Sequence, residues 1–160
     1  MYRISVVLLF IALSVLSFAQ TRNKSIPAFD IVQSDGKHLK ATDLQQGKPV
    51  MIVYFDPDCD HCVLFINDLK KQAAKFENCE VVLVTYVPLK RLKTYVSESG
   101  LAKYPGFKAG TEGTKFTVRF HYDVIQFPYL ALHDSSGKLF ATFESDVPSA
   151  TALADMLRGK

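Results

Sequence analysis

Two cysteines, Cys59 and Cys62, stand in the stretch FDPDCDHC at residues 55–62, with one acidic residue and one histidine between them. Two thiols at this spacing can form a structural disulfide, supply half of a metal site, or exchange disulfides with another protein. The third cysteine, Cys79, has no neighbour at such a spacing. If the first two act as a pair, one thiol is therefore left over.

A structural disulfide explains the pair poorly. Chain entropy gives a bridge across so short a loop about 2 kcal/mol, against about 3 kcal/mol across a fifteen-residue loop. With 160 residues, of which 48% are hydrophobic, the chain can also form an ordinary core without such a bridge.

A metal site would need more ligands than the pair supplies. Structural zinc normally takes two well-spaced ligand pairs, and the sequence contains no second pair. His38, His121 and His133 each stand alone along the chain, and we interpret them as surface or loop histidines. Cys79, at the start of an apolar run, is interpreted as a buried thiol without a chemical role. We therefore predict no metal ligands and no bound cofactor.

Thiol-disulfide exchange fits the pattern best. It requires one accessible sulfur held as a thiolate and a second sulfur close enough to release the bound substrate. At the start of a helix, free backbone N–H groups and the positive end of the helix dipole favour an anion at Cys59. Cys62, one turn later on the apolar face of that helix, is then sheltered and acts second.

The side chains next to Cys59 have opposing effects on its ionisation. A protonated or donating His61 stabilises the thiolate, whereas Asp58 and Asp60 oppose it if their carboxylates face the sulfur. For both aspartates we prefer the roles of helix N-capping and interaction with the helix dipole. The sequence therefore does not set the redox potential of the pair.

Hydrophobic periodicity places the cysteine pair between a strand and a helix. Residues 49–55 form a continuous apolar run, which is typical of a strand buried on both faces. Apolar residues then recur at helical spacing from Cys62 to Phe76. A second apolar run at residues 81–87 completes a strand, helix, strand unit, whose two strands we expect to be parallel.

The other elements complete a single α/β domain. In chain order we predict a leading hairpin with a helical turn (29–44), a helix (89–100), a loop (102–114), a short helix (115–121), a hairpin (129–143) and a last helix from Ser149. This order of strands and helices predicts a central sheet covered on both faces. We expect the loop segment 104–113, the most individual part of the chain, to border the active site and to select the partner.

Residues 1–19 have the layout of a secretory signal peptide. Arg3 precedes an apolar run from Ile4 to Leu16, and residues 17–19 provide a small-x-small cleavage site. This run is shorter and more polar than a membrane-spanning helix requires, so we predict no membrane span after cleavage. The mature domain, residues 20–160, is then periplasmic or secreted, in a compartment that permits disulfides.

The charge balance excludes one class of partner. The formal net charge is +3 at pH 7. A nucleic-acid-binding domain normally concentrates far more positive charge on one face, so we expect no nucleic-acid partner.

With the cysteine pair between a buried strand and a helix, the chain resembles the thioredoxin-like superfamily, and within it the exported TlpA/ResA-like thiol-disulfide oxidoreductases. The segments that carry the resemblance are, in order, Ile26–Phe29, Ser34–Lys37, Gly47–Val50, Cys59–Cys62, Tyr122–Leu130 and the turn Asp134–Lys138. The resemblance implies a thioredoxin-like three-layer fold with a mixed sheet and an N-terminal hairpin extension. It also implies that Pro128 is a cis-proline beside Cys59 and that Phe127 offers backbone groups to a substrate polypeptide.

The resemblance further implies an enzyme that exchanges disulfides or dithiols in protein substrates and is recycled by a redox partner, in a direction that the sequence does not reveal. Two positions depart from the family pattern. Asp58 replaces a common tryptophan, and Val53 stands where thioredoxins themselves keep a buried acid. The proton acceptor for Cys62 is therefore unassigned.

Two other classes of protein with the same fold offer alternatives. Peroxiredoxins place a threonine three positions before the reactive cysteine, and Asp56 occupies that position here, which disfavours peroxide reduction. Copper-delivery proteins use a CxxxC pair with a distant histidine, so this spacing is one residue short. Because His121 and His133 are present, a copper-binding or other metal-binding chaperone is kept as the alternative, together with a redox-silent binding module.

Overall fold

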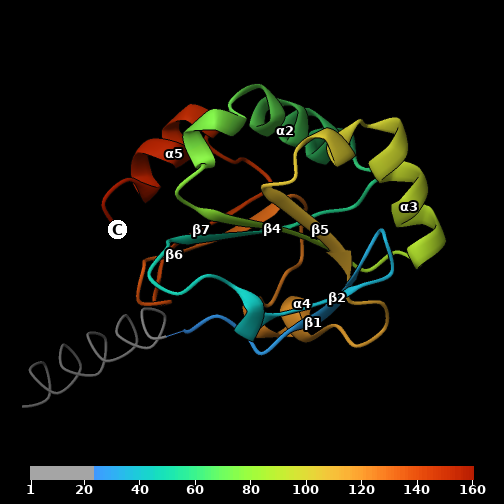
Figure 1. The fold of residues 1–160 in the computed structure, drawn as a ribbon, viewed down its shortest axis with the longest axis horizontal. Coiled ribbons are helices and arrows are strands. Elements are labelled where there is room, and N and C mark those ends of the chain that lie inside the picture. The colour runs from blue at the N-terminus through green and yellow to red at the C-terminus, as the bar shows by residue number, and fades with distance from the viewer. Residues whose placement is uncertain (1–23) are drawn as a thin grey trace, which may run out of the picture.

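The computed structural model describes residues 24–160, so the predicted signal peptide lies outside the described residues. Within them, seven strands form one sheet in the spatial order β2-β1-β5-β4-β3-β6-β7 (Figure 1). The strands are β1 (Asp30–Gln33), β2 (His38–Lys40), β3 (Val50–Tyr54), β4 (Glu80–Thr85), β5 (Phe107–Thr111), β6 (Tyr129–His133) and β7 (Leu139–Glu144). The helices are α2 (Asp60–Lys71), α3 (Leu89–Glu98), α4 (Thr117–Tyr122) and α5 (Ala150–Leu157).

Strand β3 lies inside the sheet and is buried on both faces, as its apolar run predicts. It is parallel to β4 and antiparallel to β6. Alternate side chains point to opposite faces: Met51 and Val53 join the core beneath α2 and α5, whereas Ile52 joins the core on the side of α4. Figure 1 shows α2 and α5 on one side of the sheet and α4 on the other. The predicted α/β class and three-layer arrangement are confirmed.

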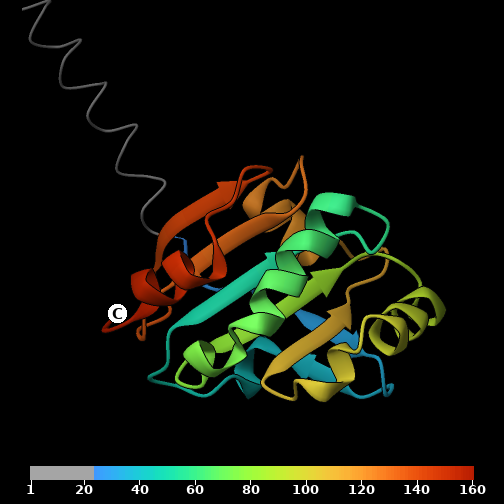
Figure 2. The same cartoon turned by 90° about the horizontal axis from the view of Figure 1, so that it is seen from above.

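Helix α2 begins where its apolar periodicity begins. Its buried residues are Cys62, Phe65, Ile66 and Leu69, and they form a single stripe against the sheet. Figure 2 shows α2 lying over the sheet and running in the same general direction as the strands. The helix ends at Lys71 rather than near Phe76, because the chain turns at Gln72 into a short 3₁₀ segment, Ala73–Phe76. No helix of the described part is long and apolar enough to span a membrane.

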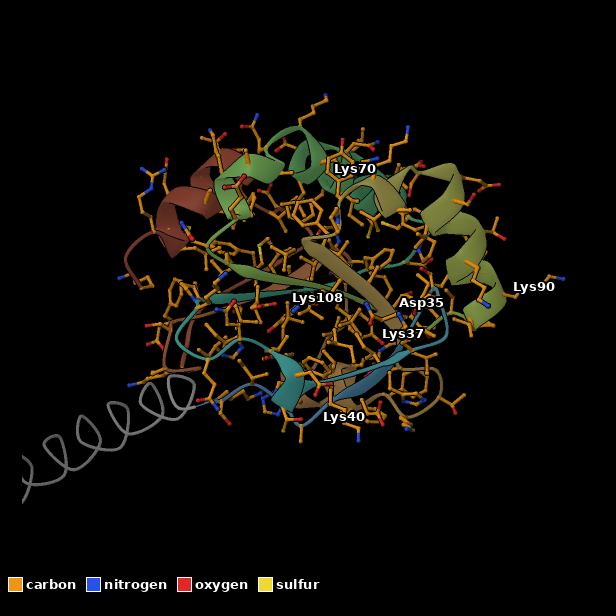
Figure 3. All side chains as sticks on the ribbon, in the orientation of Figure 1. Asp35, Lys37, Lys40, Lys70, Lys90 and Lys108 are labelled. Carbon is orange, nitrogen blue, oxygen red and sulfur yellow. The ribbon has the colours of Figure 1, made fainter. Side chains whose placement is uncertain are left out.

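The predicted loop at 102–114 is wrong, because it contains strand β5. This strand lies between β1 and β4 and is parallel to β4. The sequence does not predict this strand because Lys108 and Gly110 interrupt its apolar pattern. Lys108 is an ion-pair partner of the buried Glu80 on β4 and extends from the sheet beside it (Figure 3).

Gly110 is accounted for by close packing against the leading hairpin. A Cβ atom at this position would lie 2.7 Å from both Cγ1 and Cδ1 of Ile31 on β1. Such contacts are too short for any side chain, so the residue that weakens the strand signal is the one that lets β1 approach β5.

The last hairpin and helix agree with the prediction. β6 and β7 are antiparallel, and Asp134 Oδ1 accepts hydrogen bonds from the backbone N–H groups of Ser136 and Lys138 in the turn between them. Ser149 caps α5 by accepting a hydrogen bond from the Ala152 N–H over 3.3 Å.

Candidate active site

Cys59 and Cys62 lie at the turn that joins β3 to α2. Cys59 is the N-cap residue of α2 and is half-buried, whereas Cys62 lies in the first turn of the helix and is fully buried. Asp56 shapes the turn: its carbonyl oxygen accepts the Cys59 N–H over 3.1 Å, and its Oδ1 accepts the Asp58 N–H over 2.9 Å. The sheet thus holds the turn on one side, and the apolar stripe of α2 holds it on the other.

The segment before β6 lies directly beside the first cysteine. Its Phe127–Pro128 peptide bond is cis, and the Phe127 carbonyl oxygen lies 4.0 Å from Cys59 Sγ. The Phe127 ring stacks against both Tyr54 and Tyr86, with ring centroids 5.9 and 6.0 Å apart. The structure therefore brings Phe127 and Pro128 to Cys59 across a separation of 68 residues in the chain.

The two thiols have different surroundings. The pKa of the Cys62 thiol is raised to about 12. Burial is the largest cause, a hydrogen bond from the Asp56 backbone acts in the opposite direction, and the nearby Cys59 and Asp56 charges add to the rise. Cys62 is therefore a protonated, inaccessible thiol at neutral pH. Cys59 is partly open to solvent and lies at the end of a helix where N–H groups are free.

The acidic residues of the turn have roles other than the capping that we predict. Asp58 is exposed and pairs with Arg91 of α3, with Oδ1 and Nη2 2.5 Å apart, and the N-cap position is held by Cys59 without a side-chain hydrogen bond. Capping by Asp58 is therefore wrong, because the guanidinium competes for its carboxylate. Asp60 and His61 are exposed in the first turn of α2, where Asp60 can still interact with the helix dipole.

The basic residues of α3 differ in where they point. Lys90 points away from the helix into solvent, as Figure 3 shows, and Lys93 is exposed too. Arg91 is only partly exposed because it turns back to the cysteine turn.

Tyr86 and Arg119, for which the sequence predicts no role, complete the site together with Asp56. Tyr86, which follows β4, donates a hydrogen bond from its hydroxyl to Asp56 Oδ2 over 2.5 Å. The guanidinium carbon of Arg119 on α4 lies 5.7 Å from the ring centroids of both Tyr86 and Phe127. Asp56 is recognisable as the residue after a buried strand, but the sequence carries no signal that Tyr86 would bond to it, or that Arg119 would pack on Tyr86 and Phe127.

The buried carboxylate of Glu112 links β3 to the start of α4 next to the site. Glu112, directly after β5, accepts the Tyr54 hydroxyl over 2.7 Å and the Val118 N–H over 2.7 Å. It is 5% exposed, so these bonds fix the start of α4, and with it Arg119, against β3. Only this end of the segment 104–113 approaches the cysteines, because Phe107 begins β5 at the opposite edge of the sheet.

His121 and His133 lie away from the cysteine pair. The interpretation of His133 as a surface or loop histidine is wrong, because it is fully buried at the end of β6. His133 is opposite Val50 at the far end of β3, where it bonds to the Tyr122 hydroxyl over 2.7 Å and to the Gly137 carbonyl over 3.0 Å. The His121 ring packs on the Tyr122 ring, on the same side of the fold. Among the described residues no three His, Cys, Asp or Glu side chains are grouped so as to hold a metal ion. The two histidines of the copper alternative thus do not meet the cysteine pair in this fold.

Cys79 is also remote from the pair. It precedes Glu80, which is opposite Val50, and so lies at the other end of β4 from the cysteine turn. Burial raises the pKa of its thiol to about 12.

A family model described as the AhpC/TSA family matches residues 23–153 of the sequence. No curated protein sequence matches the chain.

Several solved structures share the fold. The thioredoxin domain of a thiol-disulfide oxidoreductase from Bacteroides vulgatus has a TM-score of 0.69 and 18% identity, over 86% of this chain and 98% of that one. A secreted Mycobacterium tuberculosis disulfide oxidoreductase, homologous to Escherichia coli DsbE, has a TM-score of 0.67 and 18% identity, over 81% and 94%. The exposed lipoprotein thioredoxin of Streptococcus pneumoniae has a TM-score of 0.62 and 21% identity, over 81% and 97%. At these identities the matches establish the fold alone.

Proposed function

Because this chain belongs to the AhpC/TSA family and has a thioredoxin-like fold, we propose that it exchanges disulfides with protein substrates through Cys59 and Cys62. One observation carries the proposal: a half-buried sulfur at the start of α2 is followed, one turn later, by a fully buried thiol. Exchange needs this asymmetry, since one sulfur must meet the substrate and the other must stay hidden until the first is bonded.

In the proposed reaction the Cys59 thiolate attacks one sulfur of a substrate disulfide. A mixed disulfide forms, and the other substrate sulfur leaves as a thiolate. Cys62 then attacks Cys59, so the first substrate sulfur is released and the cysteine pair becomes oxidised. The same steps in reverse oxidise a dithiol, and the redox partner that recycles the pair decides the direction.

The segment before β6 supports a polypeptide as substrate. The Phe127 carbonyl beside Cys59 is an acceptor at the place where an extended chain would pass the sulfur. We assign Phe127 and Pro128 to substrate binding, and His61 to stabilisation of the Cys59 thiolate from its exposed position in the first turn.

We propose an extracytoplasmic location for the domain. The predicted signal peptide is one argument. The M. tuberculosis neighbour is described as secreted and the S. pneumoniae neighbour as an exposed lipoprotein, which agrees with it.

The test uses a peptide that contains one disulfide. The reduced wild-type protein should reduce the peptide with one equivalent of protein, and Cys62→Ser should stop at a covalent adduct with the peptide, detected by mass spectrometry and released by a reductant. Cys59→Ser should give neither product, and Cys79→Ser should behave as the wild type. A Cys62→Ser protein that is folded but forms no adduct, together with stoichiometric metal on the wild type, would sink the proposal in favour of the metal-binding alternative.

A further inference from the structure

The guanidinium of Arg119 lies among three aromatic rings beside the cysteine turn. Its carbon Cζ is 5.7 Å from the ring centroids of Tyr86 and Phe127 and 5.8 Å from that of Phe116. The three rings come from the end of β4, the start of α4 and the segment before β6, which are far apart in the chain. Because each ring face attracts a cation, the packed fold holds the guanidinium in one place.

This guanidinium has no anionic partner among the residues that the structure describes. The other two arginines there are paired, Arg91 with Asp58 and Arg158 with Asp155. Arg119 is half-buried, and none of its side-chain nitrogens is closed to solvent without a partner. Its N–H donors, arranged in a flat fork that matches a carboxylate, are therefore open to a ligand.

The acids near the site do not fill this place. Asp56 Oδ2 accepts the Tyr86 hydroxyl, and the two oxygens of Glu112 accept the Tyr54 hydroxyl and a backbone N–H of α4. Asp60 is on α2, which lies on the opposite side of the sheet from α4 (Figure 1). Residues 1–23 contain no Asp or Glu. A carboxylate that pairs with Arg119 in this arrangement therefore comes from another molecule.

The backbone at Phe116 is strained in a way that serves the same arrangement. Phe116 has left-handed dihedral angles, with φ 49° and ψ 29°, which are costly for so bulky a residue. In this conformation its ring lies against Arg119 and, edge to face, against Phe120 at a centroid distance of 5.7 Å. Strain of this kind persists where the surrounding packing imposes it, and it is found preferentially at functional sites.

Exposed apolar side chains are concentrated in the segments that form the site. The exposed large apolar residues of the described part are 67%, 70% and 76% exposed, and they are Leu64, Phe120 and Ile125. Leu64 lies on α2 two residues after Cys62, and Phe120 directly follows Arg119. Ile125 follows the residue whose N–H donates to the Arg119 carbonyl over 3.0 Å. Such a concentration indicates a face that a partner covers.

Phe127 connects Arg119 to the reactive sulfur. Its ring lies against the guanidinium, and its carbonyl oxygen is 4.0 Å from Cys59 Sγ. A polypeptide that passes this carbonyl to reach Cys59 therefore brings the residues next to its own cysteine toward Arg119.

We propose that Arg119 determines substrate specificity by binding an acidic side chain next to the reactive cysteine of the protein substrate. The proposal rests on the proposed exchange function and narrows its substrates to polypeptides with Asp or Glu close to the disulfide. Because the rings hold the guanidinium in place before the substrate arrives, little side-chain entropy is lost when the pair forms.

The probes are three short peptides with one central cysteine, alanine on each side of it, and glutamate, glutamine or lysine at both ends. Each cysteine carries pyridine-2-thiol as a mixed disulfide. The Cys59 thiolate attacks the peptide sulfur, and the electron pair of the broken S–S bond leaves on the pyridine sulfur. The released group takes a proton from solvent and is measured as the absorbing thione.

Two controls isolate the preference of the protein. All proteins carry Cys62→Ser and Cys79→Ser, so only Cys59 reacts. The same peptides react with 2-mercaptoethanol, whose thiolate has the charge of the Cys59 thiolate but no binding site. Each rate constant of the protein is divided by that of 2-mercaptoethanol, which removes the intrinsic reactivity of the peptide.

In the reference protein the normalised rate for the glutamate peptide should exceed that for the glutamine peptide by ~5-fold or more, because a charge-assisted pair forms. The lysine peptide should be the slowest. Arg119→Gln should abolish the preference, and Arg119→Lys, which keeps the charge but not the flat fork, should show a smaller one. Lys90→Gln removes an equal charge from a side chain that points into solvent (Figure 3) and should keep the full preference. A general effect on Cys59 would change the rates of all three peptides alike.

The outcomes separate this inference from the function on which it rests. Equal normalised rates for the three peptides in the reference protein overturn the role of Arg119, and so does an undiminished preference in Arg119→Gln. If Arg119→Gln does not fold, Arg119→Met replaces it, since its unbranched apolar side chain can still pack among the rings. Absence of thione release by the reference protein, or equal release by Cys59→Ser, refutes the exchange function instead.

Discussion

The Tyr86 hydroxyl donates a hydrogen bond to Asp56 Oδ2 over 2.5 Å, and so joins the end of β4 to the turn that carries Cys59. The two residues are 30 positions apart in the chain. They meet because β3 and β4 are parallel neighbours, so that both strands end at the same edge of the sheet. Residues at this edge are placed by the sheet rather than by the loops, which gives the cysteine turn a rigid support.

Replacement of Tyr86 by phenylalanine should lower the free energy of unfolding by about 1–2 kcal/mol, because a hydrogen bond to a charged acceptor is lost. Urea denaturation near neutral pH measures the change. Tyr104→Phe is the control: its ring stacks on Phe107 as before, and we expect a change within about 0.5 kcal/mol. Equal stability of the two variants would mean that the Asp56 bond contributes nothing.

Replacement of Glu112 by glutamine should lower the free energy of unfolding by about 2 kcal/mol or more. The glutamine amide keeps one oxygen that can accept a hydrogen bond. Its NH₂ group, however, would face either the Tyr54 hydroxyl or the Val118 N–H, and that buried donor would lose its acceptor. Faster amide hydrogen exchange at Val118 should accompany the loss of stability. The exposed Glu98→Gln should leave both measurements unchanged, and a Glu112→Gln protein that matches it would contradict the supporting role of Glu112.

His133 should make stability depend on pH on the acid side of neutrality. Burial lowers the pKa of His133 from 6.5 to about 4, so between these values the unfolded chain binds a proton that the folded chain does not. Stability is therefore full above the unfolded pKa and falls as the pH decreases toward 4. Between about pH 7 and pH 4.5, the wild type should lose about 2 kcal/mol more than His133→Gln. Parallel pH curves for the two proteins would refute this, and His61→Gln, at an exposed position, should follow the wild type.

Gly110→Ala should destabilise the protein by about 1–3 kcal/mol, because its Cβ would overlap the Ile31 side chain. Gly106→Ala is the matched control one residue before β5, where a Cβ meets nothing within 4 Å. Thermal or urea unfolding of the two variants compares them directly. A Gly110→Ala protein as stable as the control would show that β1 can move away at no cost.

The three thiols should differ in alkylation by iodoacetamide. Cys59 should react first near neutral pH, since it alone combines partial exposure with the start of a helix. Cys62 and Cys79, whose pKa values are raised to about 12, hold only ~10⁻⁵ of their molecules as thiolate at about pH 7. Mass spectrometry should find one label on the native protein and three labels on the urea-unfolded protein. Equal labelling of all three cysteines in the native protein would contradict the raised pKa values of Cys62 and Cys79.

The thioredoxin-like resemblance and the α/β class are confirmed, and the reason lies in local signals. The run at 49–55 and the stripe from Cys62 onward each carry the period of their own element, so strand, turn and helix follow from neighbouring residues. The placement of both cysteines at this turn follows too.

What only the tertiary structure decided involves partners that are distant in sequence. The sequence does not predict β5, because a lysine and a glycine interrupt its apolar pattern. Lys108 can lie in the sheet because it pairs with Glu80, and Gly110 is needed because Ile31 packs closely against it. Asp58 was predicted to cap the helix, but Arg91 from α3 binds its carboxylate. In the same way, nothing in the local pattern tells that the Tyr86 hydroxyl will bond to Asp56 at the cysteine turn. Local periodicity fixes which elements form, whereas charges and hydroxyl groups act on whatever the packed sheet brings within a few ångströms, and that proximity exists only in the folded chain.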